Sequence, residues 1–278
     1  MLTYITYSDL VRDVEKLALS IPWETVRRIR AVVGIPRSGL LPATMLAQHW
    51  NVPLADYDGR LLSGERAMSW SSGCGDTLLL VDDAIYRGTA MDRAAALIPA
   101  DHQLLRAAVY SHPDSPPIDF IGRVVPARRY FSWNLFGHAD AATFAFDLDG
   151  VLCLDPPVRD DDGPEYEQAL VNAVPWKLPS VKVGAIITMR LGKWRAITEE
   201  WLSRHGVQYR DLVMCPCGSA KERRVKYGIT GYGKWKGERA VDRGLSLFVE
   251  SDDAQAVEIH LSTGMMVICP TTGRYWSC

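Results

Sequence analysis

The chain has 278 residues, which is long enough for one large domain or for two domains of ordinary size. Hydrophobic residues make up 47% of it, so each half can bury a core of its own, and the formal net charge of −2 gives no electrostatic reason to expect a nucleic-acid partner. No apolar run approaches the length of about 18 residues that a membrane-spanning helix needs, and the N-terminal residues do not resemble a secretory signal. We therefore expect a cytoplasmic protein with no membrane partner.

The six cysteines are scattered along the chain, which does not suggest a disulfide framework and suits a reducing compartment. Cys215 and Cys217 look like half of a zinc site, but their one-residue spacing and the lack of a second pair at ligand spacing argue against zinc. A basic cluster runs from Lys221 to Lys226, and such a cluster is more typical of a solvated face than of a binding surface.

In the first half of the chain, buried strands alternate with helices. Apolar residues recur at helical spacing after Ser8, which we expect to be the N-cap of the first helix. Further helices are predicted at 38–50, where Pro42 is tolerated near the first turn, and at 89–98. The continuous apolar runs at 31–35, 78–81 and 105–110 predict strands of a parallel sheet that is covered on both faces.

A second alternating series begins after the short stretch of small residues at 139–142. We predict its strands at 143–146, 183–187, 245–249 and 265–268, with a helix after the second strand that places Trp201 and Leu202 on one face. The expected fold class is therefore α/β, with two doubly wound parallel-sheet domains at residues 1–138 and 143–278.

Two adjacent carboxylates, Asp82 and Asp83, follow the buried strand at 78–81, and a short turn containing Gly88 leads from them into a helix. Ligands of open α/β sheets bind at such strand ends, and the N–H groups at the start of a helix can hold a phosphate. Adjacent carboxylates can also accept hydrogen bonds from a vicinal diol. The pattern therefore suits a ribose 5-phosphate.

The stretch from Leu78 to Met91 resembles the phosphoribosyl-pyrophosphate motif of type I phosphoribosyltransferases. The resemblance implies that Asp82 and Asp83 bind the ribose hydroxyls and that the following loop binds the 5-phosphate. The chain departs from the family at Tyr86 and Arg87, where a Thr or Ser is usual, and Arg87 offers a charge-assisted contact instead. The loop residues implied by the resemblance are Ala84, Ile85, Tyr86, Arg87, Gly88, Thr89 and Ala90.

An upstream loop between a strand and a helix also fits this family. There, by resemblance, the backbone amides of Ser38 and Gly39 bind pyrophosphate and Arg37 adds positive charge. The polar stretch 58–76 matches the mobile catalytic loop of such enzymes, with Arg60 and Arg66 as candidates to meet the pyrophosphate. An ordinary connection between strands is an equally open interpretation of that stretch.

The aromatic segment 128–134 looks like the part of purine-type members that stacks on the nucleobase, with Trp133 as the best candidate and core packing as the alternative. The implied reaction is a Mg²⁺-dependent exchange of pyrophosphate for a base nitrogen at the ribose C1 of phosphoribosyl pyrophosphate. The sequence does not identify the nucleobase.

In the second half, Asp147 and Asp149 follow a buried strand and precede Gly150, which permits a tight turn. This stretch resembles the first motif of haloacid-dehalogenase-like (HAD-like) phosphohydrolases, which have a Rossmann-like fold. The segment between the first and second motifs of this chain leaves room for only a small cap domain. The resemblance implies that Asp147 is the nucleophile that forms an aspartyl-phosphate. It also implies that Asp149 is the general acid and base, which favours phosphatase over dehalogenase chemistry.

The remaining HAD-like motifs follow in order, each near a predicted strand. Thr188 is the hydroxyl residue of the second motif, and Lys236 is preferred over Lys234 and Lys221 as the lysine of the third. Arg190 and Arg195 are candidates to read the substrate, with a surface role or a salt bridge as the alternative. The implied Mg²⁺ ligands are Asp147, Asp149, Glu250 and Asp253, with Asp252 left open as an alternative to Asp253.

These motifs predict a bifunctional enzyme of nucleotide metabolism. Its substrates would be phosphoribosyl pyrophosphate, a nucleobase and a phosphate monoester such as a nucleotide. One alternative is a HAD phosphatase whose first domain only senses phosphoribosyl pyrophosphate or a nucleotide, and the weakest is a scaffold without catalysis. The sequence leaves open whether the protein forms a homodimer.

Overall fold

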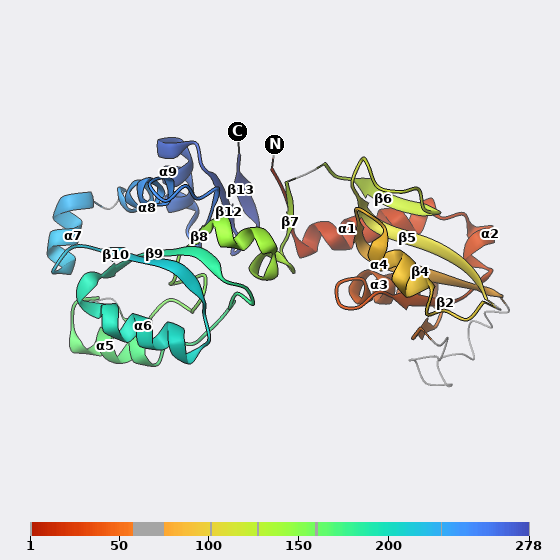
Figure 1. Cartoon of the computed structure of the whole chain (residues 1–278), viewed down its shortest axis with the longest axis horizontal. Helices are drawn as coiled ribbons and strands as arrows, with labels where there is room; N and C mark the ends of the chain where they lie inside the picture. The colour runs from red at the N-terminus through yellow and green to blue at the C-terminus, as the bar shows by residue number, and fades with distance from the viewer. Residues whose placement is uncertain are drawn as a thin grey trace. The chain divides into compact units, whose positions relative to one another are not determined.

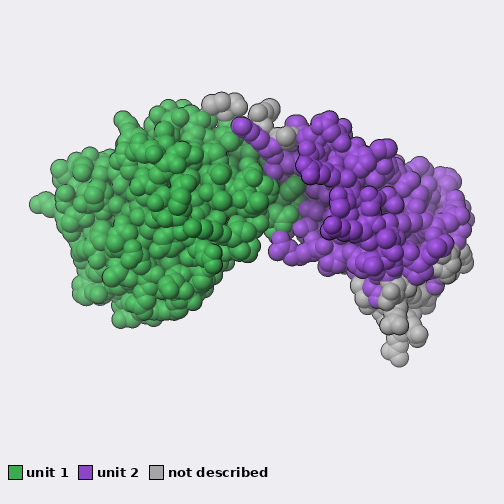
Figure 2. All heavy atoms as spheres, in the orientation of Figure 1, with its two compact units in different colours: residues 1–4, 130–278 green, residues 5–129 purple. Residues whose placement is uncertain are grey.

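The computed structural model describes residues 2–57, 75–100, 102–126, 128–158, 161–228 and 230–277. Contacts divide the chain into two compact units, which Figure 2 colours separately. Unit 1 comprises Met1–Tyr4 and Tyr130–Cys278, and unit 2 comprises Ile5–Arg129. The boundary comes earlier than the junction expected at 139–142, because the Tyr130 ring packs edge-on against Phe144 of the unit 1 core, with ring centroids 5.2 Å apart.

Unit 2 contains a five-stranded parallel sheet with the strand order β3-β2-β4-β5-β6. Its central strand β4 is buried along almost its whole length, as expected from the continuous apolar run at 78–81. The strands are β2 (Ile29–Gly34), β3 (Leu54–Ala55), β4 (Thr77–Ile85), β5 (Gln103–Ser111) and β6 (Phe120–Val124). The helices are α1 (Tyr7–Ser20), α2 (Trp23–Val26), α3 (Leu40–Trp50) and α4 (Thr89–Ala95).

Helices cover the unit 2 sheet as the alternation of strands and helices predicts (Figure 1). Met91 and Ala94 of α4 join a buried cluster with alternate residues of the central strands, among them Val33 and Leu80. Helices α1 and α3 pack against each other; α3 also contacts β2 and β4, and α1 contacts β5 and β6.

The N-cap of the first helix lies two residues before the one that the sequence suggested. Thr6, not Ser8, is the N-cap, since its hydroxyl accepts a hydrogen bond from the Asp9 N–H and the Asp9 carboxylate accepts one from the Thr6 N–H. This reciprocal capping box satisfies two donors at the helix start, whereas Ser8 lies exposed within the first turn. The other predicted helices and strands differ from the structure mainly at their ends, and the structure adds the unpredicted strands β3 and β6 and helix α2 in this unit.

Unit 1 contains a six-stranded sheet with the strand order β10-β9-β8-β11-β12-β13, in which only β13 is antiparallel. Of these strands, β10 and β13 were not predicted from the sequence. The strands are β8 (Phe144–Phe146), β9 (Val183–Leu191), β10 (Tyr209–Cys215), β11 (Leu247–Val249), β12 (Met266–Cys269) and β13 (Arg274–Trp276). A separate two-stranded sheet pairs β1 (Thr3–Ile5) with β7 (Arg129–Phe131).

Both faces of the unit 1 sheet are buried. Successive residues of a strand point to opposite faces, so Ala145 joins one cluster with α8 and α9, whereas Phe144 and Phe146 join another with α6. Within the described residues, no helix is both long enough and apolar enough to cross a membrane. The helices are α5 (Pro164–Val171), α6 (Arg195–Arg204), α7 (Ala220–Tyr227), α8 (Tyr232–Val241) and α9 (Asp253–Thr263), and short 3-10 helices lie at η2 (Leu135–Gly137), η3 (Ala139–Thr143) and η4 (Gly192–Trp194).

Each parallel sheet has one point at which the strand order reverses direction. In unit 2 the chain passes from β2 to β3 on one side and then places β4 on the other side of β2. In unit 1 it passes from β8 through β9 to β10 and then returns to place β11 on the other side of β8. Open α/β sheets bind ligands beyond the carboxyl ends of the strands at such a switch point. The fold therefore selects the ends of β2 and β4, and of β8 and β11, as candidate sites.

We expect Thr6→Ala to destabilise the protein by about 1 kcal/mol, because it removes the hydroxyl that caps α1. Chemical unfolding of the full chain measures this effect. The matched control is Ser8→Ala, which removes an exposed hydroxyl from the same helical turn and should change the free energy of unfolding by less than about 0.5 kcal/mol. A larger loss for Ser8→Ala than for Thr6→Ala would contradict the assignment of the cap.

Candidate functional site

The acidic pair of unit 2 lies near the end of β4, within the strand. Both Asp82 and Asp83 are buried, and the Asp83 N–H donates to Asp82 Oδ1 at 2.9 Å. The loop after β2 approaches them closely: a Cβ at Gly39 would stand 2.7 Å from the carbonyl oxygens of Ile35 and Val81, and 3.0 Å from Asp82 Cα. The glycine is therefore what lets the two predicted binding motifs meet at the switch point.

Burial and mutual repulsion disfavour simultaneous ionisation of the two adjacent carboxyl groups. Burial, and then the neighbouring Asp83 carboxylate, raise the pKa of Asp82 to about 8. Burial, and then Asp82, also raise the pKa of Tyr57, while burial lowers the pKa of Arg129 against the opposing effect of Asp83. Tyr57 and Arg129 are thus electrostatic neighbours of the pair that the sequence did not single out for this role.

The loop predicted to bind the phosphate is shorter in the structure than the prediction from the sequence. Ala84 and Ile85 continue β4, where they pair with Tyr110 and Ser111 of β5, so only Tyr86, Arg87 and Gly88 form the turn. Ile85 is buried, and its carbonyl accepts a hydrogen bond from Ser115 Oγ at 2.9 Å, which gives this residue a structural role. The last two predicted loop residues, Thr89 and Ala90, begin α4.

The bulky turn residues that replace the usual hydroxyl residues pack on one another. The Tyr86 ring stands edge-on to His112 with centroids 4.7 Å apart, and the Arg87 guanidinium lies 5.7 Å from the Tyr86 ring centroid. Tyr86 remains half exposed.

The other residues predicted for this site lie in different parts of the structure. Arg37 is exposed and Ser38 partly buried in the loop between β2 and α3, where the Pro36–Arg37 peptide bond is cis. Trp133 belongs to unit 1 and stacks on Phe131, with ring centroids 5.0 Å apart, so the division of the chain does not group it with the acidic pair as expected. Arg60 and Arg66 lie outside the described residues.

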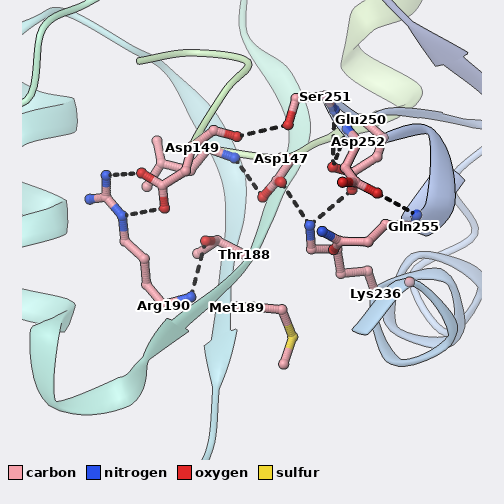
Figure 3. Close-up of polar contacts among 12 residues, drawn as sticks. Asp147, Asp149, Thr188, Met189, Arg190, Lys236, Glu250, Ser251, Asp252 and Gln255 are labelled. Carbon is pink, nitrogen blue, oxygen red and sulfur yellow. Dashed lines mark hydrogen bonds and ion pairs between the residues drawn. The ribbon is translucent and has the colours of Figure 1, made fainter. Parts of the chain in front are cut away.

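In unit 1, a buried lysine joins two carboxylates at the second switch point. Lys236 Nζ of α8 lies 2.7 Å from Asp147 Oδ2, at the end of β8, and 2.9 Å from Glu250 Oε2, at the end of β11 (Figure 3). The Asp147 N–H also donates to the Val249 carbonyl at 2.9 Å, which ties the two strand ends together. The alternatives to Lys236, Lys234 and Lys221, are both exposed.

Burial dominates the electrostatics of this triad. Burial, and then Glu250, raise the pKa of Asp147 well above its usual value, although the Lys236 ammonium opposes this shift. For Lys236, burial lowers the pKa but the Asp147 and Glu250 carboxylates more than compensate, so its pKa is raised. The lysine therefore stays charged and stabilises negative charge at Asp147.

Asp149 is held by Arg190, so the salt bridge left open as the alternative for this candidate substrate residue is formed. The Arg190 side chain has no exposed surface, and its Nη2 and Nε donate to Asp149 Oδ1 and Oδ2 at 2.5 and 2.9 Å (Figure 3). Such a bidentate pair fixes the plane of the carboxylate. Gly150 has a φ of +74°, and a Cβ there would collide with Ser251, so the turn after Asp149 requires glycine.

One cavity of about 470 Å³ contains the predicted catalytic residues. Asp147, Asp149, Thr188 and Lys236 all line it, and the Thr188 hydroxyl accepts a hydrogen bond from the Arg190 N–H at 3.2 Å. These residues come from β9, from α8 and from the segment that directly follows β8. The topology therefore gathers them at one place.

Two of the predicted metal ligands, Glu250 and Asp253, are directed away from the cavity. Glu250 is fully buried, and its carboxylate accepts hydrogen bonds from Lys236 Nζ and from the N–H groups of Ser251 and Asp252. The Asp253 carboxylate accepts hydrogen bonds from Thr272 Oγ1 at 2.7 Å and from Arg274 Nη1 at 3.0 Å. Asp253 does not line the cavity.

Of the predicted metal ligands, Asp147, Asp149 and Asp252 line the cavity, but the Asp149 carboxylate is held by Arg190. No three His, Cys, Asp or Glu side chains of the described ranges form a cluster that could hold a metal ion. Mg²⁺ commonly binds through one or two carboxylates together with water and substrate phosphate, so this donor set fits it.

Several residues that line the cavity were not predicted from the sequence, among them Asp155, Trp176 and Tyr232. Arg223 of the basic cluster, which was expected on a solvated face, also lines the cavity and is mostly buried. Burial, and then Asp149, raise the pKa of Asp155. Tyr232 was accessible to sequence reasoning, because it lies four residues before Lys236 and hence on the same face of α8. The others come from irregular segments or another helix, for which the sequence gave no such signal.

Two further residues considered from the sequence take structural positions. Arg195 is exposed, binds Glu199 at 3.0 Å and does not line the cavity. Cys215 and Cys217 are buried free thiols, and burial raises the pKa of Cys215 to about 11.

Sequence comparison finds phosphoribosyltransferases for about half of the chain. It is 28% identical over 155 residues to xanthine-guanine phosphoribosyltransferase of Desulfotalea psychrophila, which covers 52% of this chain and 91% of that protein. The same enzyme of Chromohalobacter salexigens is 28% identical over 120 residues, covering 41% and 70%. A solved Helicobacter pylori xanthine-guanine-hypoxanthine phosphoribosyltransferase aligns with 49% of this chain and 95% of its own, at 16% identity and a TM-score of 0.37. No protein-family model matches the chain.

We expect Lys236→Met to destabilise the protein by about 3–5 kcal/mol, because it leaves the buried Asp147 and Glu250 carboxylates without their shared cation. Chemical unfolding of the full chain tests this. Lys234→Met on the same helix is the control and should stay within about 0.5 kcal/mol, since Lys234 is exposed. Equal effects of the two substitutions would contradict the role of the triad.

The raised pKa of Asp82 predicts a pH-dependent loss of stability. The folded protein keeps a proton on Asp82 up to about pH 8, whereas the unfolded chain releases it near the ordinary value of 3.8. The resulting stabilisation is complete below about pH 4 and is lost as the pH rises to 8. Asp82→Asn removes this titration, so the variant should gain stability relative to the native sequence between pH 5 and pH 8 in thermal unfolding. A difference that does not change with pH would contradict the shift.

Proposed function

We propose that unit 2 catalyses the Mg²⁺-dependent transfer of a ribose 5-phosphate group from phosphoribosyl pyrophosphate to a purine base. The similarity to xanthine-guanine phosphoribosyltransferases supports this, and we assign it to unit 2 because that unit carries the acidic pair and the upstream loop. The observation that carries the proposal is the contact of the Gly39 loop with the Asp82 backbone at the switch point of a parallel sheet.

In this proposal the two motifs divide the substrate between them. The carboxylates of Asp82 and Asp83 accept hydrogen bonds from the ribose hydroxyls, the turn from Tyr86 to Gly88 lies beside the 5-phosphate, and the loop with Arg37 meets the pyrophosphate. The bond between C1 and the pyrophosphate oxygen breaks through an oxocarbenium-like state while a base nitrogen bonds to C1. Mg²⁺, when bound, neutralises charge on the departing pyrophosphate.

For unit 1 the proposal is hydrolysis of a phosphate monoester at Asp147. The observation that supports it is the single cavity that contains Asp147, Asp149, Thr188 and Lys236, with the Lys236 ammonium 2.7 Å from Asp147. A carboxylate nucleophile beside a buried cation and a second carboxylate is the arrangement that phosphoryl transfer through an aspartyl-phosphate requires.

The proposed reaction has two steps. Asp147 attacks phosphorus, the bond to the leaving oxygen breaks, and Asp149 gives that oxygen a proton. Water then attacks the aspartyl-phosphate and passes a proton to Asp149, which frees Asp147 and inorganic phosphate. Thr188 and Lys236 offset the charge on the phosphoryl oxygens, and Arg190 fixes the orientation of Asp149. Asp147 and Asp252 would hold Mg²⁺, which when bound polarises the phosphoryl group.

A second candidate function for unit 2 is the sensing of phosphoribosyl pyrophosphate or a nucleotide without transfer. The observation that favours it is the packing of Arg87 on Tyr86, and of Tyr86 on His112, in the turn where the family resemblance places small hydroxyl residues. In that case unit 1 would be the sole catalytic unit.

Paired substitutions separate the two proposed sites. Asp147→Asn should reduce phosphate release from nucleoside monophosphates by at least about a thousandfold, because an amide is a poor nucleophile, while binding of phosphoribosyl pyrophosphate persists. Asp82→Asn combined with Asp83→Asn should abolish that binding and leave phosphate release intact. Mass spectrometry on a panel of nucleobases with Mg²⁺ and phosphoribosyl pyrophosphate measures nucleotide, nucleoside and phosphate together, and titration calorimetry measures binding.

The possible results have different meanings. Phosphate release that survives Asp147→Asn contradicts the nucleophile, and unchanged binding in the double variant contradicts the ribose site. Binding of phosphoribosyl pyrophosphate without nucleotide formation from any base favours the sensor over the transferase.

A further inference from the structure

The cavity of unit 1 is larger than a phosphate group needs, and part of its wall is aromatic. Beside Asp147 and Lys236 it is lined by Trp176 and Tyr232, which belong to none of the motifs that suggest phosphohydrolysis. Its volume of about 470 Å³ falls in the range of sites for whole small molecules. These side chains therefore contact the part of a substrate that remains beyond the phosphate.

Trp176 is held in place by the same loop that carries the nucleophile. Its backbone N–H donates to the Leu152 carbonyl at 2.8 Å, and the Leu154 N–H donates to the Val174 carbonyl at 2.9 Å, so the two backbone segments run antiparallel. The Lys177 ammonium lies 4.4 Å from the centroid of the Trp176 ring. Even so, 42% of the Trp176 surface stays exposed. A large aromatic ring fixed at an active-site cavity but left partly uncovered is a platform for a planar ligand group.

Tyr232 supplies a second aromatic group from the face of α8 that carries Lys236. The Arg223 guanidinium lies 5.3 Å from its ring centroid and is held by Asp161 and by the Met189 carbonyl, to which Nη1 donates at 2.7 Å. The Arg223 side chain is therefore fixed beside Tyr232, and both residues line the cavity.

We infer that Trp176 and Tyr232 bind the base of a nucleoside 5′-monophosphate whose phosphate is held at Asp147. This inference rests on the phosphohydrolase activity proposed for unit 1. A planar heteroaromatic group fits a cavity wall that combines the partly exposed Trp176 ring with Tyr232. A sugar phosphate or a short aliphatic phosphate would leave the Trp176 indole exposed to water and would gain no binding energy from stacking on it.

The test compares two substrates on the full chain with Mg²⁺: guanosine 5′-monophosphate and ribose 5-phosphate, which differ by the base. For Trp176→Ala, KM for guanosine 5′-monophosphate should rise about tenfold or more, as expected from loss of base stacking. The KM for ribose 5-phosphate and kcat for both should be unchanged, and Trp176→Phe should restore most of the affinity. Trp23→Ala, which removes an exposed tryptophan from unit 2, is the matched control and should change neither substrate.

The outcomes distinguish this inference from the proposed function. If the native protein hydrolyses ribose 5-phosphate but not the nucleotide, or if Trp176→Ala affects both substrates equally, base recognition is wrong and phosphohydrolysis stands. If the native protein hydrolyses neither phosphate, the proposed function of unit 1 fails, and the inference fails with it.

Discussion

The chemistry proposed for unit 1 depends on one buried cation. Lys236 lies between Asp147 and Glu250 and joins α8 to the ends of β8 and β11, where the strand order reverses. Burying a charged lysine with two carboxylates costs desolvation energy that their attraction must offset, so the arrangement is sensitive to the loss of any member. Glu250 is saturated by Lys236 and backbone donors, whereas Asp147 faces the cavity. The triad thus holds the proposed nucleophile in place and screens its charge.

The same topological rule places the acidic groups of both units. Parallel strands that diverge on either side of a central strand leave a crevice at their carboxyl ends, and side chains just after those strands point into it. In unit 2 this brings Asp82 and Asp83 to the loop that contains Gly39, and in unit 1 it brings Asp147 together with Lys236. The proposed roles still differ: the first pair accepts hydrogen bonds from a sugar, whereas Asp147 forms a bond to phosphorus.

The sequence predicted the most buried strands of both units, because these are continuous apolar runs, although it gave no such signal for β3, β6, β10 and β13. It also favoured Lys236, and the structure brings this lysine to Asp147. It did not predict that Arg190 binds Asp149, since the two residues are 41 positions apart and either could have faced a substrate. Nor did it separate Asp252 from Asp253. That distinction arises at the start of α9, where the Asp252 side chain caps the helix and the Asp253 carboxylate turns away from the cavity to Thr272 and Arg274. Partners distant in sequence and cap geometry require the fold.

The central claim is that a phosphoryl group is transferred to Asp147. Borohydride reduction of the full chain during turnover of a nucleoside 5′-monophosphate with Mg²⁺, followed by peptide mass spectrometry, tests it most directly, because the reduction converts an aspartyl-phosphate to homoserine. We expect substrate-dependent homoserine at position 147 and none at Asp149. Phosphate release without modification at position 147, or modification at a different aspartate, would contradict it.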